Sequence, residues 1–178
     1  RTQMLAKLPV FSDFAAVEKA RVENGSTLAL LRPARITKLE IKKSDNPEWT
    51  EADKNKLIGL QKQTELFDVT EENKQIRLLE KLPFDFYYHY ECDVKGETFS
   101  YRHKLVDWEV GALYRKMKQD HGDNWETPFW HKLEKYLPSK DLMFLLGTIH
   151  RFPHQWLLIS VIYPPKPLAE NPNQAGLF

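Results

Sequence analysis

The chain has 178 residues, 42% hydrophobic and 29% charged, and its 26 basic and 25 acidic residues leave a net charge of +1. A chain of this size fits one globular domain that needs neither a disulfide nor a metal to fold. The charge balance removes the simplest argument for a protein that binds nucleic acid or a membrane surface, although it does not exclude a local basic patch. The lone cysteine, Cys92, excludes an internal disulfide and a cysteine-based zinc site.

No apolar run approaches the roughly 20 residues that a membrane span needs. The N-terminal residues also lack a signal-peptide pattern. We therefore expect a cytoplasmic protein without a membrane partner.

The N-terminal part predicts a helix and then two strands. The range 12–23 can be capped by Ser12 or Asp13, and a turn follows it. Strands are expected over 26–31 and 35–42. Because apolar residues only partly alternate in the second strand, we expect it to contain a bulge or to lie at an edge.

The range 44–80 is more polar than the rest of the chain. Thr50 can cap a helix over 51–60, whose first turn is acidic. The residues that follow this helix show little apolar periodicity. We expect 44–80 to form a solvent-exposed helix-and-loop excursion.

The second half predicts two hairpins that flank a pair of helices. A strict alternation favours a half-buried strand over 84–91, which turns at Gly96 and returns over 98–106. Helices are expected over 108–119, after an Asp107 cap, and over 125–136. Two nearly continuous apolar runs, 141–149 and 155–163, predict a buried hairpin, with a helix as the alternative for either run.

This order of elements predicts an α+β fold with a mixed, mostly antiparallel sheet built from hairpins and with helices packed on one face. Residues 1–163 form a single domain in this interpretation. The range 164–178 is rich in proline and asparagine and is expected to be an extended C-terminal tail.

Three sequence runs carry a resemblance. They are FxFxYxYxC from Phe84, VDWEVGALYRK from Val106, and DLxFLLGT with the later YPPK from Asp141. These runs resemble a family of uncharacterised prokaryotic proteins over about residues 30–165. The resemblance implies no activity.

The connection between the last two strands is the first candidate site. Pro153 disfavours a helix there, so the two imidazoles four residues apart are not placed to share a metal, and we expect no metal or cofactor. At a hairpin tip, planar cations and aromatic rings suit stacking on the bases of DNA or RNA or binding of phosphate. The residues concerned are His150, Arg151, Phe152, His154 and Trp156. The alternative is an ordinary polar turn.

The second candidate site lies at a strand-to-helix junction. Asp107 and Glu109 could hold a divalent ion beside His103, as in a metal-dependent nuclease or other hydrolase. The alternative assigns Asp107 to helix capping and Glu109 to the helix dipole. The chain has no GxSxG, Walker or GxGxxG motif, which disfavours other catalytic classes.

Two QxxLF segments form the third candidate. They resemble the short motif by which bacterial polymerases and repair proteins dock onto the sliding clamp, where a glutamine fixes register and a Leu-Phe pair fills apolar pockets. The resemblance implies a sliding clamp or another protein subunit as partner. The residues are Gln63, Leu66 and Phe67 in the excursion and Gln174, Leu177 and Phe178 at the C-terminus. Alternatively, both segments pack on the core.

Together these features predict a non-catalytic binding or accessory module associated with nucleic acid or a nucleic-acid-processing complex. The metal-dependent nuclease or other hydrolase is one alternative. A structural subunit of a protein assembly, whose exposed aromatic residues are covered by another chain, is the other.

Overall fold

The computed structural model describes residues 8–65 and 80–163. The chain divides into two compact units, Arg1–Glu40 with Phe86–Phe178 and Ile41–Asp85. The predicted excursion, 44–80, falls within the second unit. The single domain over 1–163 stays a prediction.

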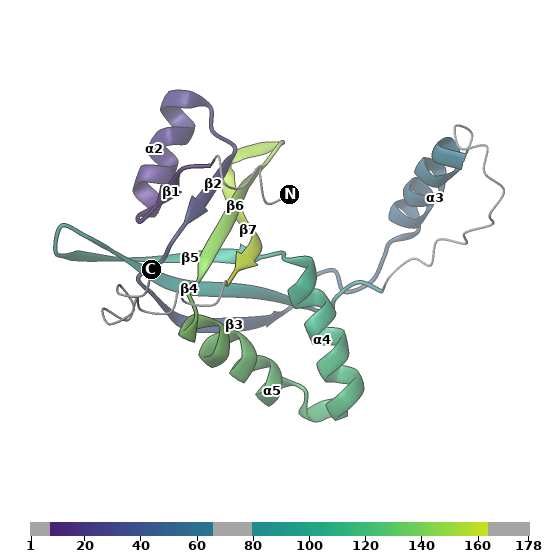
Figure 1. Ribbon diagram of the computed structural model, residues 1–178. Coiled ribbons are helices and arrows are strands. Elements are labelled where there is room, and N and C mark those ends of the chain that lie inside the picture. The colour runs from purple at the N-terminus through teal and green to yellow at the C-terminus, as the bar shows by residue number, and fades with distance from the viewer. Residues whose placement is uncertain (1–7, 66–79, 164–178) are drawn as a thin grey trace, which may run out of the picture. The chain divides into compact units, whose positions relative to one another are not determined.

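The described residues form a seven-stranded sheet in the order β1-β2-β6-β7-β5-β4-β3 (Figure 1). Pairs β1–β2 and β5–β7 are parallel, whereas β2–β6, β4–β5 and β6–β7 are antiparallel. The strands are β1 (Val10–Phe11), β2 (Leu28–Leu31), β3 (Arg35–Lys43), β4 (Phe84–Val94), β5 (Glu97–Leu105), β6 (Met143–Ile149) and β7 (Phe152–Ile162). The predicted α+β fold with a mixed sheet is confirmed, and β3 lies at an edge. Packing of the helices on one face stays a prediction.

Two helices begin at capping residues that local sequence indicated. Helix α2 (Phe14–Asn24) is capped by Asp13, whose side chain accepts from the Ala16 amide at 3.3 Å, and ends at Gly25 with φ 66°. In α3 (Glu51–Glu65), the Asp53 amide donates to the Thr50 hydroxyl at 3.1 Å. Helix α3 continues five residues beyond the predicted end.

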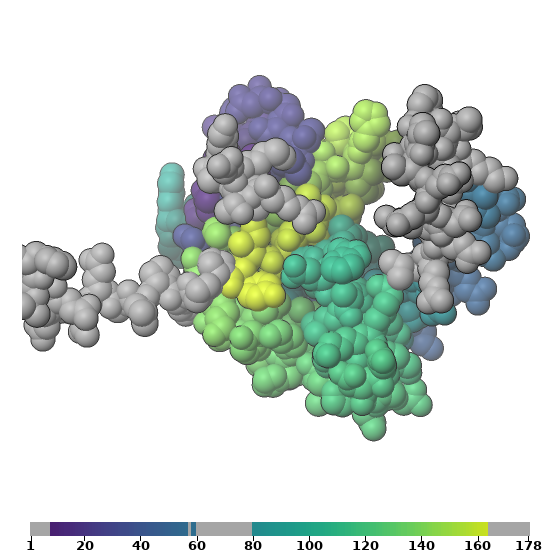
Figure 2. Space-filling model, turned by 45° about the vertical axis from the view of Figure 1, so that its right-hand side comes forward, coloured from purple at the N-terminus to yellow at the C-terminus, as the bar shows by residue number. Residues whose placement is uncertain are grey.

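The predicted helix pair is present, but its second member is irregular. Helix α4 (Trp108–His121) is followed by a 3₁₀ turn, η1 (Gly122–Asn124), and then by α5 (Glu126–Trp130). Helix α5 continues into a π-helix, η2 (His131–Tyr136), and a 3₁₀ turn, η3 (Leu137–Ser139). Helix α4 and the α5–η2 segment lie side by side at the surface (Figure 2). Among the described residues, none of the helices is long and apolar enough to cross a membrane.

The β4–β5 hairpin supplies the aromatic part of the core. Its turn has left-handed backbone at Lys95 and Gly96, with φ of 51° and 87°, as a tight two-residue hairpin turn requires. Alternate residues of β4 are buried on one face: Phe86, Tyr88, Tyr90 and Cys92. The Phe86 ring lies 4.9 Å from Phe129 of α5, and the Tyr88 hydroxyl donates to the Leu133 carbonyl of η2 at 2.7 Å.

The β6–β7 hairpin is central in the sheet, as its apolar runs predicted. Side chains of β7 and β2 fill the space above Gly147, where a Cβ atom would lie 3.1 Å from Ile159 Cδ1 and 3.3 Å from Leu28 Cδ2. The connection is shorter than predicted, because pairing extends to Ile149 and Phe152 and leaves only His150 and Arg151 between the strands. A register shift between Thr148 and Ile149 accommodates the tighter turn.

Candidate functional site

The end of the β6–β7 hairpin exposes a group of side chains that we call the crest: His150, Arg151, Phe152, Pro153 and His154. All five residues are exposed, and Phe152 is 49% accessible. The Phe152 and His154 rings lie 6.3 Å apart in an edge-on arrangement, since alternate residues of a strand point to the same side. Arg151 forms no ion pair within the described part of the chain. The crest therefore offers ring faces and a cation to solvent.

Trp156 does not belong to the crest, and its predicted placement there is wrong. Its side chain is 5% exposed, and the indole N–H donates to Glu18 of α2 at 2.8 Å. Glu18 also accepts from Arg21 Nε at 3.0 Å, and both contacts lower the Glu18 pKa, with Arg21 contributing most. Trp156 thus attaches β7 to α2, because helix α2 covers this part of the strand.

Two of the three catalytic candidates, His103 and Asp107, make contacts within the fold, whereas Glu109 is exposed. His103 Nδ1 lies 3.1 Å from the Tyr90 hydroxyl, its ring lies 4.5 Å from Phe14, and burial lowers its pKa to about 4. Asp107 is 8% exposed and accepts from the amides of Glu109 at 2.8 Å and Val161 at 2.7 Å.

These contacts engage His103 and Asp107 within the fold, and the metal-dependent nuclease stays a prediction. No group of three or more histidine, cysteine or acidic side chains is placed to hold a metal within residues 8–65 and 80–163. Asp107 and Glu109 line a pocket of about 130 Å³ with Lys132 and Tyr163. Asp107 is explained by its role as the α4 cap, which its position before the helix indicated.

The predicted protein-docking residues are largely untested. Gln63 falls in the last turn of α3, whereas the sequence had placed it beyond the helix. Leu66, Phe67, Gln174, Leu177 and Phe178 lie outside the described residues. Docking through QxxLF therefore stays a prediction.

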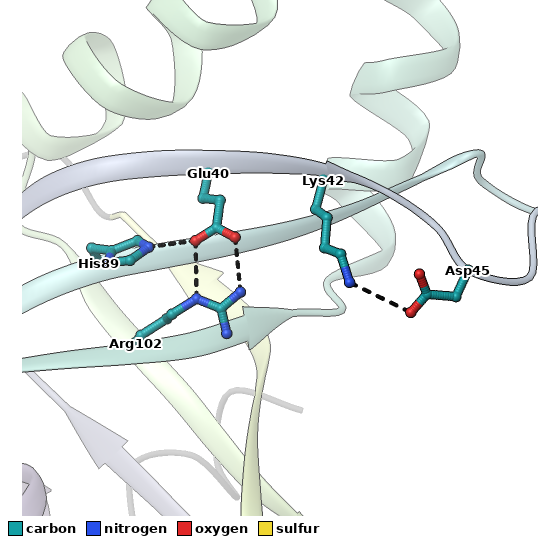
Figure 3. Close-up of polar contacts among 5 residues, drawn as sticks. All are labelled: Glu40, Lys42, Asp45, His89 and Arg102. Atoms are coloured by element: carbon teal, nitrogen blue, oxygen red, sulfur yellow. Dashed lines mark hydrogen bonds and ion pairs between the residues drawn. The ribbon is translucent and has the colours of Figure 1, made fainter.

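A polar network on the opposite face of the β4–β5 hairpin was not predicted (Figure 3). Glu40 Oε2 lies 2.6 Å from His89 Nε2, and the Glu40 carboxylate accepts from Arg102 Nε at 2.9 Å and Nη2 at 2.8 Å. The Arg102 guanidinium lies 3.7 Å from the centre of the Tyr87 ring. Hydrogen bonds from Arg102 and then His89 lower the Glu40 pKa to about 2.

This network pairs its charges internally, so we assign it to stabilisation of the sheet. In the Ile41–Asp85 unit, Lys42 Nζ and Asp45 make a separate ion pair at 3.4 Å (Figure 3). The local sequence could not reveal the Glu40 network, because His89 and Arg102 meet only through the β4–β5 register.

A groove between α4 and the α5–η2 segment was also missed. It has a volume of about 720 Å³, and Leu113, Met117 and Pro128 contribute its apolar surface. Its basic and imidazole side chains come from both helical segments: Lys116, His121, His131 and Lys132. We call this feature the α4–α5 groove. The spacing of Leu113, Lys116 and Met117 on one helical face was a signal for it.

The fold is that of an α+β protein with a mixed sheet, and two separate surface features, the crest and the α4–α5 groove, are candidate sites on it. The chain belongs to the family described as Domain of unknown function (DUF8757), whose model matches residues 11–178. The resemblance to an uncharacterised family is thereby confirmed, and its prokaryotic origin stays a prediction. No curated protein and no solved structure matches the chain.

Proposed function

We propose that this protein is a non-catalytic accessory module that contacts single-stranded nucleic acid through the crest. The observation that carries this proposal is the exposure of Phe152 beside Arg151 at the end of the β6–β7 hairpin. A base can stack on an exposed aromatic ring or a guanidinium plane, while the cation is attracted to the phosphate. Single strands fit best, because their bases are free to stack.

The size of the crest supports an accessory role. One aromatic stack contributes about 1–3 kcal/mol per base, and a phosphate contact adds an electrostatic attraction that salt weakens. A micromolar complex needs about 8 kcal/mol. The crest alone falls short of that value, so it would act as one contact within a larger nucleic-acid-processing complex.

The test compares binding of a fluorescein-labelled single-stranded oligonucleotide, as DNA and as RNA, by the wild type and by crest variants. Arg151→Ala and Phe152→Ala are each expected to weaken binding by about five- to tenfold, because each removes one phosphate contact or one stack. Arg151→Ala should also reduce the slope of log affinity against log salt by about 0.7. Fluorescence anisotropy measures both effects.

Lys95→Asn provides a matched control at the end of the other hairpin. Asparagine tolerates the left-handed backbone at this position while the cation is removed. Binding should change less than twofold. An Arg151→Ala/Phe152→Ala double variant that binds as tightly as the wild type would refute the crest as the contact.

A further inference from the structure

The α4–α5 groove is distinct from the crest. Figure 1 shows the end of the β6–β7 hairpin at the top of the view and α4 and α5 at the bottom. The groove is built from helical residues, and none of the crest side chains lines it. A ligand of the groove therefore does not depend on the function proposed for the crest.

The charges at the groove select an anionic partner. Lys116 and His121 project from α4, and His131 and Lys132 from the other segment, whereas no carboxylate lines the groove. Lys116 pairs with Asp120 at 3.7 Å, and their side chains are 70% and 43% exposed. Such an exposed pair contributes little, so the ammonium can exchange Asp120 for a carboxylate of a ligand.

The apolar residues of the groove, which we call its floor, indicate what kind of anionic molecule fits it. Leu113, Met117 and Pro128 offer aliphatic and thioether surface, and a methionine adapts its shape to different apolar side chains. A groove of this kind is suited to the apolar face of an amphipathic helix. The stretch of α4 from Leu113 to His121 is about 12 Å long, which matches roughly two turns of a bound helix.

We propose that the α4–α5 groove binds an acidic, amphipathic segment of a partner protein, whose apolar side chains lie on Leu113 and Met117 and whose carboxylates face Lys116 and His131. Nucleic acid fits this floor less well, because Leu113, Met117 and Pro128 are aliphatic or thioether side chains, which offer a base no large aromatic ring to stack on. A second copy of the groove fits less well too, since a twofold axis would place its cations against the same cations.

The probe is a fluorescein-labelled helical peptide of about 12 residues that carries leucine at every third or fourth position and glutamate elsewhere. Two matched peptides replace either all glutamates with lysine or all leucines with alanine. The Glu/Leu peptide is expected to bind the full chain at least about tenfold more tightly than either matched peptide, measured by anisotropy at about 50 mM salt.

The protein variant is Lys116→Glu with His131→Glu, which reverses the charge at one side of the groove and introduces a negative charge at the other side. It should weaken binding of the Glu/Leu peptide by at least about tenfold and strengthen binding of the Lys/Leu peptide, a gain that an unfolded variant cannot produce. Lys118→Glu is the matched control, because Lys118 lies on α4 but pairs with Asp123 away from the groove. It should change binding less than twofold.

Three results would overturn the proposal. One is equal binding of the Glu/Leu peptide to the wild type and to the Lys116→Glu/His131→Glu variant. Another is displacement of the peptide by a single-stranded oligonucleotide whose own affinity falls in this variant, which would assign the groove to nucleic acid. The last is a dimer of the wild type, seen by sedimentation, that the double variant abolishes.

Discussion

Asp107→Ala is expected to destabilise the protein by about 2–4 kcal/mol. One carboxylate oxygen accepts from the Glu109 amide at the start of α4, and loss of such a cap costs about 1 kcal/mol. The other oxygen accepts from the buried Val161 amide of β7 at 2.7 Å. A buried amide that loses its acceptor costs about 1–3 kcal/mol more. The substitution therefore weakens both the helix start and its attachment to the sheet.

Urea unfolding followed by tryptophan fluorescence measures this change, provided that the slope with urea stays the same. Asp107→Asn should lose about 1–2 kcal/mol, because one amide keeps an oxygen acceptor while the other faces an NH₂ group. Glu109→Gln, at an exposed position of the same helix, should stay within about 0.5 kcal/mol of the wild type. If Asp107→Ala has the same free energy of unfolding as Glu109→Gln, the two amide contacts of Asp107 do not hold α4 to β7.

Two further predictions concern how the stability of the protein changes at acidic pH. The His103 pKa is about 4 in the folded protein and 6.5 ordinarily. As the pH falls, the unfolded chain therefore takes up a proton before the folded protein does. The free energy of unfolding should fall by up to about 3 kcal/mol between pH 6.5 and pH 4. His103→Gln should remove most of this slope in urea titrations at several pH values, and an unchanged slope contradicts the assignment. The Glu40 pKa is about 2 instead of 4.5, so its stabilisation is complete above pH 4.5 and is lost as the pH falls toward 2. Glu40→Gln should lower the free energy of unfolding by about 1 kcal/mol at neutral pH and make it depend less on pH below 4.5. If the pH dependence below 4.5 is the same as in the wild type, Glu40 does not stabilise the sheet in this way.

The elements that sequence predicted well are those whose signals are local. The alternation from Phe84 to Tyr90 predicted a half-buried β4, Gly96 marked its turn, and Asp107 marked the start of α4. Each of these signals acts over a few residues, so the rest of the fold does not alter it. The parallel pairing of β5 with β7 was not predictable in this way, because it joins residues about fifty positions apart.

The candidate sites show the same contrast between features that follow from local sequence and features that depend on distant residues. The exposure of Arg151 and Phe152 followed from their place at a hairpin end, whereas the burial of Trp156 depends on Glu18 of a helix far away in the sequence. The α4–α5 groove escaped prediction for a related reason. Each helix shows its own spacing of apolar and basic residues, but only the packed structure places Met117 and His131 at the same groove.

The contact of Glu134 with β3 affects how the protein behaves in concentrated solution. The Leu39 amide of this edge strand donates to the Glu134 carboxylate of η2 at 2.6 Å. An amide that is already satisfied cannot recruit the carbonyl of a neighbouring molecule, and a carboxylate beside it repels an approaching backbone oxygen. Glu134 therefore opposes intermolecular sheet extension at the middle of β3, a nine-residue edge strand.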